Sequence, residues 1–242
     1  MNFKRIILFI SAISLIVMTL LNAVSLAVFG NMEYYRKEFE KHTVTDNIDM
    51  DMDDIMYVMD ELMAYLNGDR ENLENIITGV NGETRDFFSV REKIHMADCK
   101  VIFDAAFKIR TASTIIFIVS VLLLIAMKGM DVGKLLLYAG IISIVVIAAA
   151  AVIAVAAAID FNRCFVIFHK LFFDNDLWLL DPEKDMIINI LVEPFFADMA
   201  LKIAGYCSAV LAVLVGSGAC VYITDKRGEI YDGCTESIEN SW

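Results

Sequence analysis

The stretch that decides the fold is residues 6–29, which read IILFISAISLIVMTLLNAVSLAVF. It has no charged side chain, and its length of about 24 residues corresponds to about 36 Å of helix, against a bilayer hydrocarbon core of about 30 Å. Such a run predicts a transmembrane helix. A cleaved signal peptide is the alternative, with Ala23-Val24-Ser25 as its cleavage site. The apolar run is longer than the usual signal-peptide core of about 7–15 residues.

Three more apolar runs follow, over residues 111–127, 135–159 and 204–223. Hydrophobic residues make up 58% of the chain and the mean hydropathy is +0.62, values typical of an integral membrane protein. The chain has neither a low-complexity linker nor a solenoid repeat. We therefore expect a single integral membrane unit over residues 1–242, an all-α membrane protein with four transmembrane helices.

Basic residues set the expected orientation. Lys4 and Arg5 precede the first apolar run, and positive charge favours the cytoplasmic side. Basic residues also flank the opposite ends of the spans, so the charge bias is weak. We therefore take the orientation from the first helix, which usually dominates. Four crossings then place both termini in the cytoplasm. Residues 31–110 and 160–203 then lie together on the extracytoplasmic face of the membrane.

The formal net charge of −12 comes largely from acidic clusters in the first of these outer segments, including Asp49, Asp51, Asp53 and Asp54. Phosphate binding requires Lys and Arg, so nucleic acid is excluded as a partner. Membrane lipids are the partners that the apolar runs require. We interpret most of the acids as a solvated surface.

The outer segment has a helical pattern of its own. Apolar residues at positions 55, 58, 59, 62, 63 and 66 form one face of a helix over 51–66, which Asn67-Gly68 ends. Ser89 and Glu92 form a capping box that starts a second helix, running on into the second apolar run. Asn81-Gly82 predicts a turn between them. The spans therefore carry a helical extracytoplasmic cap.

Cysteine usage argues against a disulfide framework. Of the five cysteines, only Cys99 and Cys164 fall on the outer face, where a disulfide between them is one option. No C-x-x-C or H-E-x-x-H motif occurs, so we expect neither a metal nor another cofactor.

Two of the three histidines are candidates for proton transfer. On a helix, His95 shares a face with Arg91 and Asp98. Asp98 is then expected to hold one imidazole nitrogen and leave the other free. His42 lies in a polar connector and is interpreted as a surface residue. For His95, the alternative is an ordinary surface histidine in an ion cluster.

The second candidate lies in residues 161–196, where polar groups stand among aromatic side chains that favour the membrane interface. His169 follows an aromatic run, although a histidine among aromatics is often mere packing. Trp178 is expected to anchor the following loop, and Asn175 and Asp176 are candidates to bind substrate. Asp181, before Pro182, is expected to bond backbone amides in a turn.

Four segments of the chain carry a resemblance to a known family: Tyr34-Tyr35, VMDELMAYLNG (58–68), REKIHMADCK (91–100) and FHKLFFDNDLWLLDPEKD (168–185). In these segments the chain resembles the lipoprotein intramolecular transacylase (Lit) family of bacterial integral membrane proteins, which implies a place in a bacterial cytoplasmic membrane with the active site at its extracytoplasmic face. The chain departs from the family pattern at Cys99, where a small aliphatic residue is expected, and at Val192-Glu193-Pro194. The resemblance adds Tyr35 as a supporting residue of the site.

The resemblance implies a substrate and a reaction. Diacylglyceryl-modified lipoproteins are the expected substrates, and the sn-2 acyl chain moves from glycerol to the α-amine of the N-terminal Cys, giving a lyso-form lipoprotein. The amine must lose a proton, the oxyanion needs a donor and the leaving oxygen needs a proton. His95 and His169 can supply acid and base, so no enzyme nucleophile is required.

Two alternatives stay open at this point. One is a non-catalytic envelope protein whose acidic cap binds a partner, with both histidines serving as packing. The other is a membrane lipid hydrolase. The sequence does not assign the acid and the base to particular histidines, nor an oligomeric state.

Overall fold

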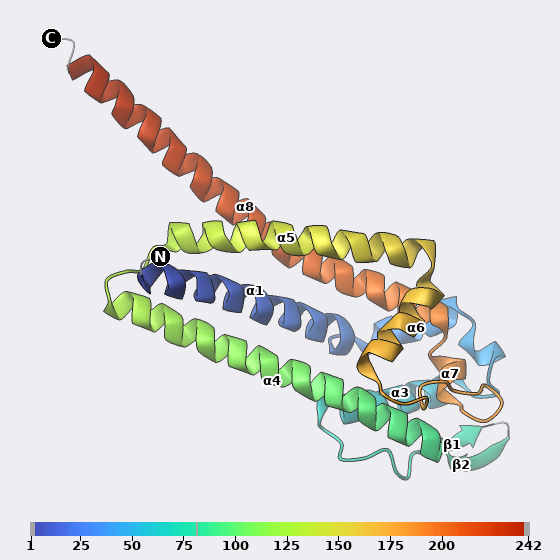
Figure 1. The fold of residues 1–242 in the computed structure, drawn as a ribbon. Coiled ribbons are helices and arrows are strands. Elements are labelled where there is room, and N and C mark those ends of the chain that lie inside the picture. Colours follow the sequence, from blue (N-terminus) through green and yellow to red (C-terminus); the bar gives the residue numbers. More distant parts are fainter. Residues whose placement is uncertain (1–2, 81, 240–242) are drawn as a thin grey trace. The chain divides into compact units, whose positions relative to one another are not determined.

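The computed structural model describes residues 3–80 and 82–239, apart from the side chains after residue 226, and is mainly helical (Figure 1). Its elements are α1 (Phe3–Phe29), α2 (Met32–Lys41), the 3-10 helix η1 (Val44–Asp46), α3 (Met52–Asn67), β1 (Ile77–Val80), β2 (Glu83–Asp86), α4 (Val90–Ala126), α5 (Val132–Ile159), α6 (Phe161–Phe172), α7 (Ile187–Ile190) and α8 (Glu193–Glu239).

Four helices are long and apolar enough to cross a membrane. They are Phe3–Phe29, Val90–Ala126, Val132–Ile159 and Glu193–Lys226. Each contains one of the predicted spans, except that the second ends one residue short of position 127. The prediction of an all-α membrane protein with four transmembrane helices is therefore confirmed. The two longest helices, α4 and α8, extend well past their apolar parts, and the charged residues at their ends lie outside those parts.

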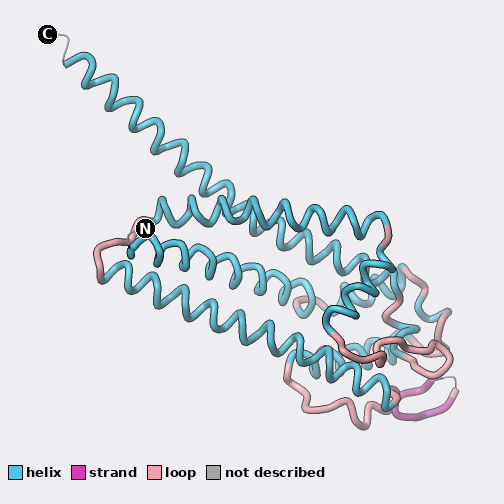
Figure 2. The backbone as a smooth tube through the Cα atoms, in the orientation of Figure 1, coloured by secondary structure: helices cyan, strands magenta, loops and turns pink. Residues whose placement is uncertain are grey.

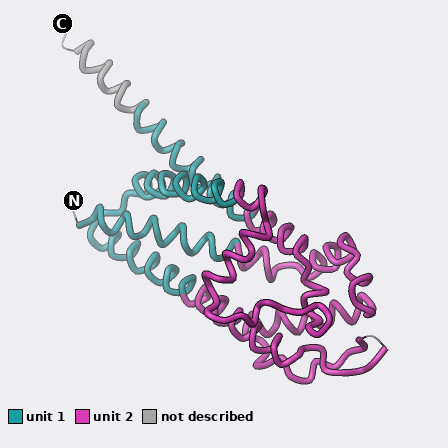
Figure 3. The backbone as a smooth tube through the Cα atoms, turned by 45° about the vertical axis from the view of Figure 1, so that its right-hand side comes forward, with its two compact units in different colours: residues 1–23, 109–153, 206–242 teal, residues 24–108, 154–205 magenta. Residues whose placement is uncertain are grey.

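The chain divides into two compact units (Figure 3). The first holds the described parts of residues 1–23, 109–153 and 206–242. Leu8, Ala12, Leu124 and Ala139 are among its buried apolar residues. A buried hydrogen bond from the Ser11 hydroxyl to the Ser120 hydroxyl, 2.7 Å long, joins α1 to α4. The prediction of a single unit over 1–242 stays a prediction.

Two glycines bring α5 and α8 close together inside this first unit. A Cβ atom on Gly218 would lie 2.8 Å from the Leu136 carbonyl oxygen, and one on Gly140 would lie 3.3 Å from the Gly218 Cα. Such contact is possible only without side chains. Membrane helices commonly associate through small residues in this way.

The second unit comprises the described parts of residues 24–108 and 154–205. Its core includes Phe39, Ile55, Met59, Leu62 and Phe87, each nearly or completely buried. Helix α3 supplies the predicted apolar face, and Gly68 ends it in the left-handed conformation with φ +91°. The predicted cap helix over 51–66 and its stop are therefore confirmed.

The loop after α3 contains two short antiparallel strands that the sequence analysis did not predict (Figure 2). Ile77 pairs with Asp86 and Val80 with Glu83. The predicted turn lies between the strands, where Gly82 has φ +76°. Asn81, its other residue, lies outside the described residues.

The predicted capping box starts α4. The Ser89 amide donates to Glu92 Oε2 over 2.6 Å, and the Glu92 amide donates to the Ser89 hydroxyl over 3.2 Å. The helix then continues without a break from the cap into the apolar run, as expected. Cys99 and Cys164 are free thiols, so the disulfide considered between them does not form.

Candidate active site

His95 lies on α4, on the part of the helix that precedes the apolar span. Charged residues recur from Arg91 to Arg110, which places this stretch outside the hydrocarbon region. The imidazole is only 5% exposed.

His169 lies on α6, which begins at the N-cap Asp160 and ends before the extended residue Phe173. The Asp160 carboxylate accepts a hydrogen bond from the Arg163 amide over 2.9 Å. His169 is 7% exposed, so it occupies the buried face of this amphipathic helix. Its Nδ1 lies 2.7 Å from the Phe165 carbonyl oxygen. Because a carbonyl only accepts, Nδ1 carries the proton and Nε2 of the neutral ring is left as a base.

The two histidines meet. Their ring centroids are 6.1 Å apart, with 34° between the ring planes. The Phe173 ring packs against both, at 5.1 Å from His95 and 5.6 Å from His169. Trp178 stacks on His169 at 4.8 Å. The pair therefore sits in an aromatic, largely dry environment.

The two nitrogens of His95 have different surroundings. Nε2 lies 3.7 Å from the Cys99 thiol, one helical turn away. Nδ1 is buried, and within the described part of the chain it has no hydrogen-bond partner. An unsatisfied buried nitrogen is costly, and at a functional site it is a position that a ligand can fill.

Burial lowers the pKa of both rings. The pKa of His95 falls to about 4, mainly through burial and then through the nearby His169, while Asp98 opposes the change and Arg91 adds to it. Burial also lowers the pKa of His169, and the bond to the Phe165 carbonyl opposes this. Both histidines are therefore neutral at pH 7, as proton acceptors must be.

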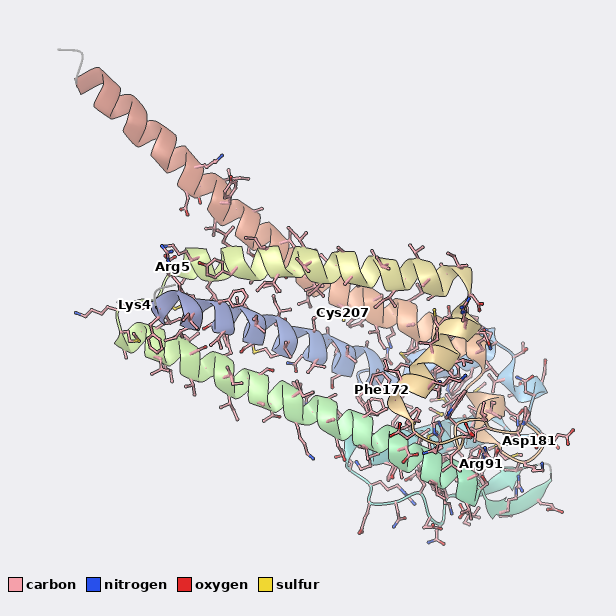
Figure 4. All side chains as sticks on the ribbon, viewed as in Figure 1. Lys4, Arg5, Arg91, Phe172, Asp181 and Cys207 are labelled. Carbon is pink, nitrogen blue, oxygen red and sulfur yellow. The ribbon has the colours of Figure 1, made fainter. Side chains whose placement is uncertain are left out.

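A loop over residues 173–186 lies beside the pair and is held by two polar contacts with α4. The Arg91 guanidinium donates to the Asp176 carbonyl oxygen over 2.5 Å. The Asn175 amide donates to the Asp98 carboxylate over 2.9 Å. Figure 4 labels Arg91 on α4 and Asp181 in the loop.

The hydrogen bond expected from His95 to Asp98 does not form in this structure, and Asp98 bonds Asn175 instead. Asp98 accepts from Asn175, while the nitrogens of His95 face Cys99 and an unpartnered position. The reason lies in the helix: His95 points into the core, whereas Asp98 is only half-buried and within reach of the loop. Asp98 thus positions the loop in this structure, and its catalytic role stays untested.

The remaining predicted residues have structural contacts. Asp181 accepts from the Glu183 amide over 3.1 Å and from Lys184 over 2.6 Å, as expected of a turn residue. The Tyr35 hydroxyl donates to the Val28 carbonyl over 3.0 Å, and its ring packs against Phe195. The Asp176 carboxylate is exposed.

Sequence reasoning missed two members of this region. Phe173, which touches both imidazoles, was only one aromatic residue among many in the sequence. Glu92 was recognised as a helix cap, yet its Oε1 also accepts a hydrogen bond from the buried Ile187 amide over 2.6 Å. A cap residue that is completely buried has such a second partner, but burial is not visible in the sequence.

His42 belongs to a separate ionic cluster and is half-buried, not a free surface residue. Its Nε2 lies 2.7 Å from the Asp198 carboxylate, with Glu38 close by. Lys41 bridges the two carboxylates at 2.6 and 3.1 Å. These three acidic and imidazole groups lie near enough to hold a metal ion. Lys41 offsets one of the two carboxylate charges, and the expectation that the protein binds no metal stays a prediction.

Together these features define a polytopic α-helical membrane protein with a buried pair of neutral histidines outside its apolar spans. The family model described as lipoprotein intramolecular transacylase Lit matches residues 9–196. The chain therefore belongs to this family, and it is an acyltransferase enzyme of the cell membrane that acts on lipoproteins. None of the curated proteins is significantly similar to the chain.

Solved structures agree with the family. The membrane integral lipoprotein intramolecular transacylase Lit from Bacillus cereus is 27% identical, with a TM-score of 0.70 over 96% of this chain and 98% of that chain. A form of the Bacillus cereus protein with one histidine replaced by alanine is 26% identical, with a TM-score of 0.70 over 94% and 96%. A form with that histidine replaced by arginine has a TM-score of 0.66 and 26% identity over 99% and 95%.

Proposed function

We propose that the enzyme moves the sn-2 acyl chain of a diacylglyceryl-modified lipoprotein to the α-amine of the same lipoprotein, using His169 and His95 as its catalytic groups. The observation that supports this most directly is the pair itself. Two buried, neutral imidazoles from separate helices have ring centroids 6.1 Å apart. Nδ1 of His95 has no hydrogen-bond partner among the described residues, and Nε2 of His169 is available as a base.

The reaction needs proton transfer but no enzyme nucleophile. The neutral amine attacks the ester carbonyl carbon, so a C–N bond forms and the carbonyl oxygen becomes an oxyanion. His169 Nε2 accepts a proton from the attacking nitrogen. The carbon–oxygen bond to glycerol then breaks, and the same proton passes to the leaving glycerol oxygen. The products are an amide and an alcohol, and both histidines return to their neutral state.

His169 is the better candidate for the base because its tautomer is fixed. The Phe165 carbonyl holds the proton on Nδ1, which leaves Nε2 unprotonated. His95 is then assigned to the oxyanion, to which its buried unpartnered nitrogen donates a hydrogen bond. A donor at this position stabilises charge that develops only in the transition state.

The loop over residues 173–186 is proposed to hold the lipopeptide. The exposed Asp176 carboxylate suits the α-ammonium group, and Arg91 fixes the backbone at that residue. Asn175 and Trp178 support the same loop through Asp98 and His169. Tyr35 and Asp181 are assigned structural support.

The dryness of the site favours transfer over hydrolysis. Phe173 is buried and packs against both imidazoles, and Trp178 covers His169. Water that is excluded from the acyl group cannot compete with the amine. Holding the amine beside the ester also removes the entropic cost of closing a ring of about eight atoms, where positioning can contribute about 7–11 kcal/mol.

The orientation proposed for the enzyme places both termini in the cytoplasm and the histidine pair at the extracytoplasmic face. Lys4 and Arg5, labelled in Figure 4, precede α1 and support a cytoplasmic N-terminus. An outer site is also where exported lipoproteins present their glyceryl ester.

The test is expression in a host that makes only diacyl lipoproteins, followed by mass analysis of the N-terminal lipopeptide. Wild type should give a lyso-form product with an unchanged total number of acyl chains. His169→Ala should abolish this product at equal protein level, and His42→Ala, which removes the histidine of the separate ionic cluster, should not. Loss of one acyl chain would show hydrolysis, and full activity of His169→Ala would remove His169 from the reaction.

A further inference from the structure

Helix α6 has three distinct faces. Its buried face carries His169. A second face carries Ile167, Phe168, Leu171 and Phe172, which are all exposed although apolar, Leu171 to 75%. These positions follow the i, i+1, i+4, i+5 spacing that places side chains together on one side of a helix.

The apolar face continues a surface that already meets lipid. Ile159, the last residue of the α5 span, is 79% exposed, and Val155 one turn earlier is exposed as well. Only Asp160 separates this span from α6. A patch of exposed large apolar side chains that begins where a transmembrane helix ends fits the acyl region of a bilayer.

The third face is cationic. Arg163 and Lys170, seven residues apart and therefore on the same side, are exposed. Within the described residues, neither side chain forms an ion pair. Unpaired cations beside a lipid-facing helix surface match the phosphates of anionic phospholipids.

We propose that α6 is an interfacial helix that binds the outer leaflet directly, with Phe168 and Leu171 among the acyl chains and Arg163 and Lys170 on lipid phosphates. The assignment to the outer leaflet rests on the proposed function and orientation, whereas contact with lipid does not. Such a helix lies parallel to the membrane surface, because its cationic face and its apolar face run side by side along the helix axis.

This contact has a consequence for the reaction. His169 follows Phe168 directly in the chain and lies on the neighbouring face of the same helix. A helix held at the boundary between phosphates and acyl chains therefore keeps its imidazole at the depth of glycerol esters. Contact with lipid would then set the depth of the His169 imidazole relative to the bilayer, which loop contacts alone do not fix.

The depth of α6 is tested with a nitroxide attached to Leu171→Cys or, as the matched control, Lys170→Cys. The full chain is placed in nanodiscs after its native cysteines are replaced. Collisions with oxygen, which is concentrated in the bilayer, should dominate at position 171, and collisions with a water-soluble nickel chelate should dominate at position 170. Equal access of the chelate to both positions would overturn the proposal, and so would protection of position 171 from both reagents, which would indicate a protein partner.

The cationic face is tested by titrating phosphatidylglycerol into the detergent-solubilised enzyme and following its unfolding temperature. Each cation removed should weaken the apparent lipid affinity about fivefold. The variant Arg163→Gln/Lys170→Gln should therefore respond far less than wild type, while Arg85→Gln/Lys184→Gln, which removes two exposed cap cations elsewhere, should respond normally. Equal titrations for the two double variants would contradict phosphate binding by α6. Neither readout depends on enzyme activity, so failure of the proposed chemistry would leave this test intact.

Discussion

Glu92 is a completely buried carboxylate, and removing it should destabilise the cap strongly. Its Oε2 accepts from the Ser89 amide and its Oε1 from the Ile187 amide, both over 2.6 Å. Ile187 is 1% exposed, so in Glu92→Ala its amide would have no water to bond. An unsatisfied buried amide costs about 1–3 kcal/mol, and the lost helix cap adds about 1 kcal/mol.

The expected loss for Glu92→Ala is therefore about 2–4 kcal/mol. Burial raises the pKa of Glu92, so part of this loss is offset when a poorly solvated carboxyl group is removed. For a chain of this size, 1 kcal/mol corresponds to about 2–4 °C in melting temperature. We expect a fall of about 4–16 °C for Glu92→Ala, and about half of that for Glu92→Gln, whose amide oxygen can accept from only one of the two donors.

The measurement is thermal unfolding in detergent at constant lipid content. Glu71→Ala, at an exposed acid of the same unit, is the matched control and should change stability by less than about 0.5 kcal/mol. An unchanged melting temperature for Glu92→Ala would refute the reasoning. Lost activity at an unchanged melting temperature would instead mean that Glu92, one turn before His95, takes part in the chemistry.

Three further predictions concern pH, packing and topology. The folded pKa of His95 lies near 4, below its ordinary value of 6.5, so its stabilising contribution is complete above pH 6.5 and is lost as the pH falls toward 4. Wild type should lose about 3 kcal/mol more than His95→Gln over that window, and parallel unfolding curves would contradict this. Gly218→Ala should destabilise by about 1–3 kcal/mol because its methyl group meets backbone, whereas Gly216→Ala, which faces open space, should not; equal melting temperatures would argue against the close crossing. A cysteine in Lys184→Cys should react with an impermeant thiol reagent in intact cells and one in Asp131→Cys should not, and the reverse pattern would invert the proposed orientation.

The features that could be predicted from the sequence are those set by neighbouring residues and by solvent. An uncharged run such as residues 6–29 has few alternatives to a membrane helix, because in lipid its backbone N–H and C=O groups can form hydrogen bonds only with one another. The Ser89 and Glu92 capping box is equally local, since both partners lie within one turn. His95 and His169 were recognised as candidates because both fall on the same predicted face of the membrane, each near carboxylates.

The features that escaped prediction depend on contacts between distant residues. Asp98 and Asn175 are far apart in the sequence, but Asn175 lies in the loop over residues 173–186 and donates a hydrogen bond to Asp98. Asp98 therefore bonds this loop and not His95. Phe173 owes its contact with both imidazoles to its place at the end of α6, which no periodic pattern indicates. The two strands are only four residues each, and their pairing, not propensity, supplies the stability.

The partner that fixes the His169 ring is a peptide carbonyl of its own helix, not an acidic side chain. Side-chain replacement at residue 165 leaves that oxygen in place but removes the Phe165 ring, which packs against His169 with 4.1 Å between the ring centroids. Alanine scanning at this position would therefore report the ring contact and not the carbonyl. The carbonyl that orients the imidazole is a backbone group supplied by helix formation. Exchanging the peptide bond between Phe165 and Val166 for an ester, which weakens the carbonyl as an acceptor and keeps the ring, would separate the two contacts.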